Sequence, residues 1–293
     1  MPGAVFLGSA SRKLAAILRG CPHFRGKSRL QQWLLRRSGV ERVKVFGYEM
    51  SLDLADVIQR DVYCGLYEPF ESRWLKDFLR PGMTVVDVGA NIGYYTWLAS
   101  QRVGPTGRVV AIEPGPYAFE RLQRVIREND VQNVEGYQLA LSDQPGRGTL
   151  YIPAAAEGNY NPSLSPYLSG MSAVEIQIDR LDDLLDRLQI AQVDLIKIDV
   201  EGHELGVFQG AVRAVRENRI GAVLCEFNEG YQACAGSSCE DLERWLADKH
   251  FTLAKRFPSK WGSKVHNRLY VATHARAASR RQVQPKCKAV PVT

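Results

Sequence analysis

The stretch that decides the fold reads Val-Val-Asp-Val-Gly-Ala-Asn-Ile-Gly and spans residues 85–93. An apolar strand runs into a glycine-rich turn, and the pattern predicts a helix from Tyr94 onward. Glycines in such a turn let backbone N–H groups approach a bound cofactor, because they lack side chains and tolerate unusual backbone angles. A second apolar strand, residues 109–112, ends in Glu113, whose carboxylate can accept hydroxyl protons from a ribose. Together these features predict a half-site for a nucleoside cofactor.

The side chains of the turn indicate which nucleoside cofactor binds. Dinucleotide sites use Gly-x-Gly-x-x-Gly and place a pyrophosphate at the helix N-terminus. Here the order is Asp87, Gly89, Asn91 and Gly93, so Asn91 stands where the second glycine would be, with a carboxylate nearby. That carboxylate repels a diphosphate and attracts a cationic methionine moiety. We therefore expect S-adenosylmethionine (SAM), with Asp87 at its amino acid end and Glu113 on its ribose.

The pattern that continues from this stretch predicts an α/β fold. Apolar strand segments alternate with amphipathic helix segments from residue 84 to about residue 228, and two edge strands follow near 251–255 and 268–273. Among these segments we expect one strand over about 134–141 and one helix over 205–215. We expect a Rossmann-like, doubly wound, seven-stranded and mostly parallel sheet. In such a sheet the ligand lies at the carboxyl ends of the strands.

Composition divides the chain into three parts. We expect a basic helical extension with a hairpin over 1–52, a catalytic domain over 53–275 and a disordered basic tail over 276–293. Residues 153–172, rich in Pro, Asn, Ser and Gly, predict a lid or binding loop, since a loop of this length is seldom a mere connector.

The charge of the chain is unevenly distributed. Residues 1–40 hold eight Lys or Arg and residues 249–293 hold eleven, and neither segment holds an acid, whereas the remaining residues 41–248 carry a net charge of −13. The basic ends predict contact with an anionic membrane leaflet or an acidic glycan, with solvated tails as the alternative. No stacking-aromatic or recognition-helix pattern accompanies the charge, so nucleic acid is not expected. Scattered cysteines and the lack of a long apolar run favour a cytoplasmic protein with peripheral membrane contact at most.

A second motif, residues 194–204, gathers ionisable groups at the end of another apolar strand. Lys197, Asp199, Glu201 and His203 lie within it, and the sheet topology brings this strand end beside the first glycine turn. Such a group can position and deprotonate a nucleophile, with His203 as the base suited to neutral pH. Acids at the start of a helix also stabilise its dipole, which accounts for Glu201 but not for Lys197 or Asp199.

A metal ion offers a second way to activate a hydroxyl. Asp199, Glu226 and Asn228 follow two neighbouring strands, and hard oxygen ligands of this kind suit Mg²⁺. The sequence leaves the choice between a metal and a protein base open.

Several motifs in their order resemble those of the FkbM-type SAM-dependent methyltransferases, over about residues 53–257. They are Gly-Leu-Tyr-Glu (65–68), Asp-Val-Gly-Ala-Asn-Ile-Gly-Tyr-Tyr-Thr (87–96), Ala-Ile-Glu-Pro (111–114), Ala-Leu-Ser-Asp (140–143) and Ile-Lys-Ile-Asp-Val-Glu-Gly (196–202). The resemblance implies the class I methyltransferase fold and O-methylation of a hydroxyl on a sugar, glycan or natural product. It also implies cofactor contacts for Glu68, Ser142 and Asp143.

We therefore expect a SAM-dependent O-methyltransferase with a small-molecule or glycan hydroxyl acceptor. One alternative is a nicotinamide-dependent oxidoreductase, which Asp87 and Asn91 disfavour. The other is a non-catalytic protein that keeps the SAM-binding fold and attaches to an acidic surface through its basic ends.

Overall fold

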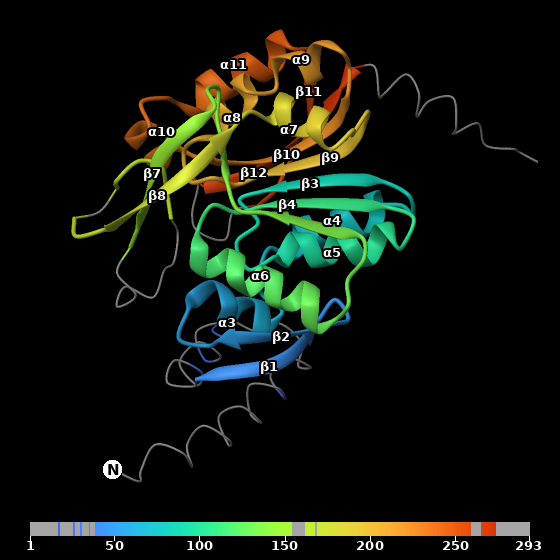
Figure 1. Ribbon diagram of the computed structural model, residues 1–293, viewed down its shortest axis with the longest axis vertical. Helices are drawn as coiled ribbons and strands as arrows, with labels where there is room; N and C mark the ends of the chain where they lie inside the picture. Colours follow the sequence, from blue (N-terminus) through green and yellow to red (C-terminus); the bar gives the residue numbers. More distant parts are fainter. Residues whose placement is uncertain are drawn as a thin grey trace, which may run out of the picture.

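The computed structural model contains a central seven-stranded sheet with helices on both faces (Figure 1). The structure describes residues 39–153, 162–167, 169–258 and 265–273, together with Ile17, Gly26, Leu30 and Leu35. The strand order is β11-β12-β10-β9-β3-β4-β5. In chain order these strands are β3 (Thr84–Val88), β4 (Arg108–Ile112), β5 (Val134–Tyr137), β9 (Val193–Ile198), β10 (Ile220–Asn228), β11 (Phe251–Arg256) and β12 (Val265–Ala272).

The order and direction of the strands establish the class I methyltransferase fold. β4, β5, β9 and β10 run parallel to β3 or to one another, and β12 alone is inserted antiparallel between β10 and β11. The chain crosses from β5 back over β3 to β9, so the topological switch point lies between β3 and β9. A ligand is expected at the carboxyl ends of these two strands. The predicted seven-stranded, mostly parallel sheet is confirmed.

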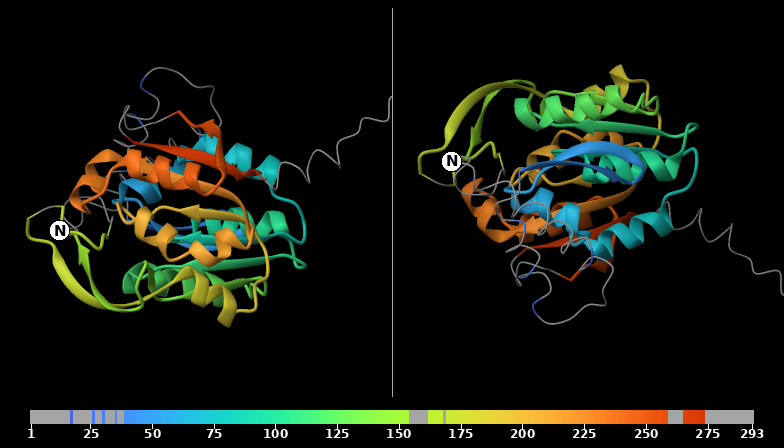
Figure 2. Two further views of the ribbon diagram at one scale, coloured as in Figure 1. Left: turned by 90° about the horizontal axis from the view of Figure 1, so that it is seen from above. Right: turned by 90° about the horizontal axis from the view of Figure 1, so that it is seen from below.

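Alternate residues of the strands build two hydrophobic layers. One face of the sheet packs on α4 (Pro69–Phe78), α5 (Tyr94–Val103) and α6 (Pro116–Glu128). The other packs on α7 (Leu181–Arg187), α8 (Glu204–Gln209), α9 (Val212–Arg216) and α11 (Cys239–Asp248). Both faces of the parallel strands are therefore buried, as their almost continuous apolar sequences require. Figures 1 and 2 show the two helical layers on opposite sides of the sheet.

An N-terminal hairpin lies against the first helical layer. β1 (Val40–Val45) and β2 (Tyr48–Asp53) pair antiparallel, and α3 (Val57–Cys64) follows. Met50, Leu52 and Leu54 are buried in the same core as α5 and α6. The expected hairpin thus forms and packs on the sheet domain, while α3 is an element that the sequence did not reveal.

A second, three-stranded sheet lies at one end of the molecule, outside the helical layers (Figure 2). It consists of β6 (Ala140–Leu141), β7 (Gly146–Ile152) and β8 (Ser172–Asp179) in the order β6-β8-β7. The expected single strand over 134–141 is wrong: it is divided between β5 and β6, which belong to different sheets. The expected single helix over 205–215 is likewise divided into α8 and α9, and α10 (Glu229–Cys234) was not foreseen.

Several expectations fall on residues that the structure does not describe. The tail 276–293 lies outside the described residues, as do nearly all of the basic helices expected within 1–40 and residues 154–161 and 168 of the loop 153–172. In the part of the chain that is described, no helix has the length and hydropathy that crossing a bilayer requires.

Candidate functional site

The two predicted turns are in direct contact at the switch point. Gly89, which follows β3, has a φ of +77°, and a Cβ at this position would lie 1.8 Å from the carbonyl oxygen of Asp199. No side chain fits there, and the positive φ also favours glycine. Gly93, with a φ of +89°, begins α5, and a Cβ there would meet the Trp97 ring at 2.5 Å. The glycines therefore bring the turn after β3 against the turn after β9.

Glu113 is fixed at the end of β4 by two backbone N–H groups. Asn91, in the left-handed region with a φ of 51°, donates its N–H to Oε2 at 2.7 Å, and Gly115 donates to Oε1 at 2.8 Å. The side chain is 5% exposed, and its burial raises the pKa to about 7 although both hydrogen bonds lower it. Each oxygen keeps a free lone pair, so the carboxylate can still accept two hydroxyl protons. This geometry suits a ribose diol.

Asp87 lies beneath the turn rather than in the cavity wall. Its carboxylate is 2% exposed and accepts a hydrogen bond of 2.5 Å from the Thr96 hydroxyl at the start of α5. Burial raises its pKa to about 6, against the lowering effects of Thr96 and Lys197. Asp87 is paired in register with Lys197 across β3 and β9. In this structure the side chain secures α5 to the sheet, whereas the sequence predicted contact with the cofactor.

The turn after β9 is shaped by a buried carboxylate of α8. Glu204, 1% exposed, accepts the N–H groups of Val200 at 3.0 Å and Gly202 at 3.3 Å, and it also accepts a hydrogen bond from Gln232. Glu201, between them, has a φ of 53°, an uncommon conformation for a residue with a side chain. The hydrogen bonds to Glu204 stabilise this strained backbone conformation. They thereby fix the position of the Glu201 backbone from which its side chain extends.

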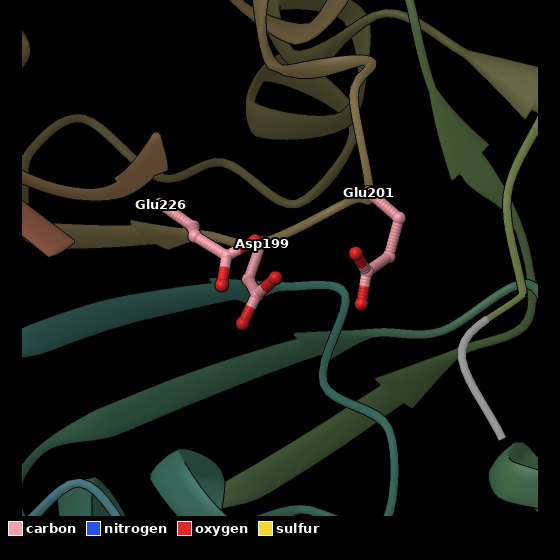
Figure 3. Close-up of side chains that lie close together, drawn as sticks. All are labelled: Asp199, Glu201 and Glu226. Carbon is pink, nitrogen blue, oxygen red and sulfur yellow. The ribbon is translucent and has the colours of Figure 1, made fainter. Parts of the chain in front are cut away.

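Three carboxyl groups meet at the ends of β9 and β10 (Figure 3). Asp199, Glu201 and Glu226 each offer an oxygen, and the three oxygens lie within 4.8 Å of one another. Burial, and then the charge of Asp199, raise the pKa of Glu201 and of Glu226 well above the usual value. These two groups therefore tend to hold protons at neutral pH, because three adjacent negative charges are unfavourable. We call these three residues the carboxyl cluster.

Lys197 lies under the carboxyl cluster as its counter-charge. Its Nζ is 3.1 Å from Asp199 Oδ2 and 5.1 Å from the centre of the Tyr95 ring, and the side chain is 2% exposed. Burial by itself lowers the pKa of Lys197, but the carboxylates of Asp199 and Glu68 outweigh it and raise the pKa above its ordinary value. Burial of a lysine charge in a core strand costs free energy unless the charge is paired, and Asp199 provides that partner for Lys197.

Glu68, expected near the cofactor, lies behind the carboxyl cluster. Its carboxyl group accepts hydrogen bonds from the Tyr95 hydroxyl and, at 3.1 Å, from Asn267 Nδ2. Burial raises its pKa to about 8, and Lys197 lowers it by less. The residue has a φ of 37° at the start of α4. It is not part of the wall of the cavity described below, and its contacts position Tyr95 and β12.

His203 faces a short segment, residues 162–167, that leads into β8. Its Nε2 is 3.0 Å from the Ser165 hydroxyl, and the Ser163 hydroxyl donates to the backbone oxygen of Glu201 at 2.8 Å. Ser163 also pairs with Tyr151 of β7. Burial lowers the pKa of His203, so the imidazole is neutral at pH 7. The segment therefore covers the turn that carries His203.

A cavity joins the two turns, and we call it the inner cavity. Its wall includes Gly89, Asn91 and Glu113 on one side and Lys197, Asp199, Glu201 and His203 on the other. Residues to which the sequence assigned no role in the site complete it: Tyr67, Tyr94, Tyr95, Pro114, Leu139, Leu150, Ser163 and Leu164. The three tyrosines and Pro114 lie within the motifs that carry the family resemblance, but neither charge nor backbone freedom singles them out there. The cavity thus joins a nucleoside-type half-site to a group of acids and bases.

Ser142, Asp143 and Asn228, which were also predicted for the site, are not part of this cavity wall. Its wall includes Ala140 and Leu141 but not Ser142, which packs against Gly206 and Gly210, nor Asp143, which accepts the Ser142 hydroxyl at 3.0 Å. Asn228 uses its side-chain oxygen to accept the N–H groups of Gly230 and Tyr231 as the N-cap of α10. Glu201, rather than Asn228, therefore completes the oxygen group that begins with Asp199 and Glu226.

Comparison with known families decides the classification. The family described as "Methyltransferase FkbM domain" matches residues 87–253, more than half of the chain. The chain belongs to the FkbM methyltransferase family. The match includes both turns and the carboxyl cluster of this FkbM-type protein, and it confirms the resemblance seen in the sequence.

Individual relatives of this FkbM-type chain cover it to different extents. The 31-O-demethyl-FK506 methyltransferase FkbM of Streptomyces tacrolimicus is 31% identical over 217 residues, 64% of this chain and 80% of that protein. The hexuronic acid methyltransferase AglP of Haloferax volcanii is 26% identical over 215 residues, 69% of this chain and 82% of that protein. Methyltransferase 1 of Beauveria bassiana is 29% identical over 143 residues, 43% of this chain. The matched part is only 57% of that fungal relative's length.

Proposed function

We propose that this protein is a SAM-dependent O-methyltransferase that acts on a hydroxyl group of a sugar, glycan or natural product. The observation that carries the proposal is the inner cavity. At one end Glu113 offers two oxygen lone pairs to a ribose, and at the other end His203 and Asp199 face the same space. Family membership supports methyl transfer as the reaction.

The residues present fit SAM rather than a dinucleotide. In the turn 89–93, Asn91 stands where a dinucleotide motif has its second glycine, and the cavity wall contains the acids Glu113 and Asp199. Such a wall disfavours a diphosphate and favours the sulfonium and ammonium groups of SAM. The open volume is about 90 Å³, below the roughly 300 Å³ usual for ligand sites. We therefore expect part of the wall to move on binding, and Pro162, Ser163 and Leu164 are the part that comes from the segment between β7 and β8.

The protein's share of the reaction is alignment, exclusion of water and removal of one proton. Bound SAM supplies an electrophilic methyl group on a sulfonium, whose C–S bond breaks as the bond to the acceptor oxygen forms. The hydroxyl is a poor nucleophile until its proton leaves. His203, neutral and within the wall, takes that proton in our proposal, and the Ser165 hydroxyl orients the ring. The ammonium group of Lys197 balances the negative charge of the nearby Asp199.

A divalent cation is the second candidate for activating the hydroxyl. Asp199, Glu201 and Glu226 would hold it, and it would stabilise the developing alkoxide. Two observations favour the metal-free version. Lys197 Nζ already lies 3.1 Å from Asp199, and the raised pKa values of Glu201 and Glu226 mean that a cation must displace protons to bind.

The names of two relatives support the acceptor class. One names a hexuronic acid, and the other names an oxygen atom of a natural product as the position that lacks a methyl group. Both are hydroxyl-bearing compounds. We extend this chemistry to the present protein as a proposal.

Methyl-labelled SAM and a panel of sugars and natural products test both the function and the base. We expect label in an acceptor, unaffected by chelator, and a loss of about 10²–10⁴ in the chemical step for His203→Ala. His266→Ala, on β12 and outside the cavity, should keep full activity.

Three other outcomes each select a different account. Loss of activity in chelator with recovery in Mg²⁺ would favour the carboxyl cluster as a metal site. Full activity of His203→Ala in chelator would leave Asp199 or Glu201 as the base. Binding of SAM without transfer to any acceptor would favour the non-catalytic alternative.

A further inference from the structure

A second cavity adjoins the inner one through two tyrosines. It has a volume of about 460 Å³ and lies between β1, the end of α3 and the start of α4. Tyr67 and Tyr94 line both cavities. We call it the outer cavity. The catalytic residues described above do not use it, so its chemistry is not explained by cofactor binding or proton removal.

The wall between the two cavities is aromatic. The rings of Tyr67 and Tyr94 meet edge to face with centroids 4.8 Å apart, and Phe46 meets Tyr94 in the same manner at 5.1 Å. The Tyr94 hydroxyl is 2.8 Å from the Ser72 hydroxyl and donates to the backbone oxygen of Tyr67 at 3.2 Å. Tyrosine combines an apolar ring with a polar tip, as suits a partly polar ligand that passes between the cavities.

Phe46 is placed at this wall at some conformational cost. It has a φ of 50° and forms the hairpin turn with Gly47, whose φ is 93°. Such a turn ordinarily favours Asn or Asp at its first position, because a bulky side chain is strained there. The Phe46 ring also lies 5.3 Å from Lys76 Nζ. The presence of a strained Phe at this position is better explained by the place of its ring in the cavity wall, beside Tyr94 and Lys76, than by the needs of the hairpin turn.

The two cavities differ in charge. The outer wall contains Lys44, Arg73 and Lys76 against a single acid, Asp77. The inner wall contains Asp199 and Glu113 against Lys197, whereas Glu201 beside them tends to hold its proton. An anionic group is attracted to the outer wall and repelled by the inner one, so the pair of cavities can orient a ligand whose charge and reacting hydroxyl lie at opposite ends.

We propose that the outer cavity binds an anionic group of the acceptor, a carboxylate or a phosphate, and thereby directs a hydroxyl past Tyr67 and Tyr94 to the inner cavity. This proposal rests on the proposed function, because the hydroxyl is the one to be methylated. Arg73 and Lys76, three residues apart and exposed on α4, provide the charge, and Phe46 provides an apolar wall beside it.

Binding of two matched pairs of compounds tests the proposal. The probes are methyl glucuronide against methyl glucoside and glucose 6-phosphate against glucose, measured by ligand-observed NMR on the full chain saturated with S-adenosylhomocysteine. We expect at least one anionic member to bind at least tenfold more tightly than its neutral partner, with an advantage that salt reduces. A preference for the first pair identifies a carboxylate, and a preference for the second identifies a phosphate.

Charge-reversal variants locate the interaction. Arg73→Glu with Lys76→Glu should abolish the preference, and Arg73→Lys with Lys76→Arg should retain it. The matched control reverses Arg124 and Arg127, which are also three apart and exposed, on α6. Equal binding of charged and neutral members in both pairs, no binding of any member, or an unchanged preference after reversal of Arg73 and Lys76 would overturn the proposal. A separate SAM titration of each variant shows whether the proposed function itself has failed.

Discussion

At the scale of single residues, Glu113 connects the sequence to the cofactor site most directly. Its position after an apolar strand predicted a ribose contact, and the structure adds the two backbone donors that hold it. Those donors are also why removal of the side chain is a poor test, since Glu113→Ala would leave two buried N–H groups unpaired. Glu113→Gln keeps an oxygen and the shape, and it removes the ionisable group.

The pKa of about 7 for Glu113 predicts a pH-dependent affinity for SAM. The ionised carboxylate accepts hydroxyl protons better than the protonated form, so affinity should rise with pH through about 7 and level off above it. We expect binding at pH 6 to be about tenfold weaker than at pH 8, because the ionised fraction falls about tenfold per pH unit below the pKa. Calorimetric titration measures this. Glu113→Gln should bind more weakly and without pH dependence between these values, and a wild-type affinity that is flat over this range would contradict the assignment.

The sequence predicted the site roles of charged residues in strands and of glycines in turns. It did not predict roles that depend on how distant elements pack together. Lys197 was recognised because a charged side chain in a core strand demands a partner. Tyr67 and Tyr95 lie within the quoted motifs and Asn267 outside them, but none of the three received a predicted role, since tyrosine and asparagine occur in many settings. Their roles follow from the packing of α4 and β12 beside the strand ends, which brings residues about 200 positions apart together, as in the Asn267–Glu68 hydrogen bond.

At the scale of elements, the contact between the two turns is the feature on which the site depends. Gly89→Ala would place a Cβ 1.8 Å from the Asp199 oxygen and would also strain a φ of +77°. Gly65→Ala is a matched control, because Gly65 has a left-handed backbone, with a φ of 67° and a ψ of 30°, but no heavy atom of the described residues lies within 4 Å of the added carbon.

Chemical denaturation of the two variants separates the free-energy cost of backbone strain from that of a steric clash. Gly65→Ala should cost about 1 kcal/mol of unfolding free energy, the usual cost of alanine in this conformation. Gly89→Ala should cost at least about 2 kcal/mol more and should weaken SAM binding, because the turns must separate. Equal losses in the two variants would show that the turns are not in contact.

The period of the apolar residues predicted the main strands and helices well, because each is long enough to show its period. It failed for short elements. The boundary between β5 and β6 is a change of sheet within the continuous stretch Val-Glu-Gly-Tyr-Gln-Leu-Ala-Leu (134–141), and α8 and α9 share one helical pattern across Gly210 and Ala211. α10 depends on the Asn228 cap, a local hydrogen bond that competes with the metal role predicted for the same side chain.

At the scale of the whole molecule, the sequence predicted the sheet because alternating strands and helices allow few arrangements. It did not predict that the hairpin and α3 would close the far side of a second cavity, since that depends on how the hairpin packs on α4 and α5. The uneven charge is also a property of the whole chain. An acidic middle and two basic ends predict contact between the ends and an external anion.

Vesicle sedimentation tests the role of the basic ends. Each basic residue near an anionic surface contributes about 1 kcal/mol, and salt screens the attraction. Removal of residues 1–28 and 279–293 should leave SAM affinity unchanged and reduce co-sedimentation with phosphatidylserine vesicles, or binding to an acidic glycan, at low salt. If the full chain binds neither, the ends are solvated tails.

The central claim is that the inner cavity is a SAM site, and a calorimetric titration of the full chain with SAM and with NAD⁺ at pH 8 tests it most directly. We expect SAM to bind at one site per chain and NAD⁺ to give no heat of binding, and Glu113→Gln to weaken SAM by at least about tenfold, the cost of a lost charge-assisted hydrogen bond. Binding of NAD⁺ without SAM would contradict the claim. So would SAM binding that Glu113→Gln leaves unchanged, because the nucleoside would then lie elsewhere.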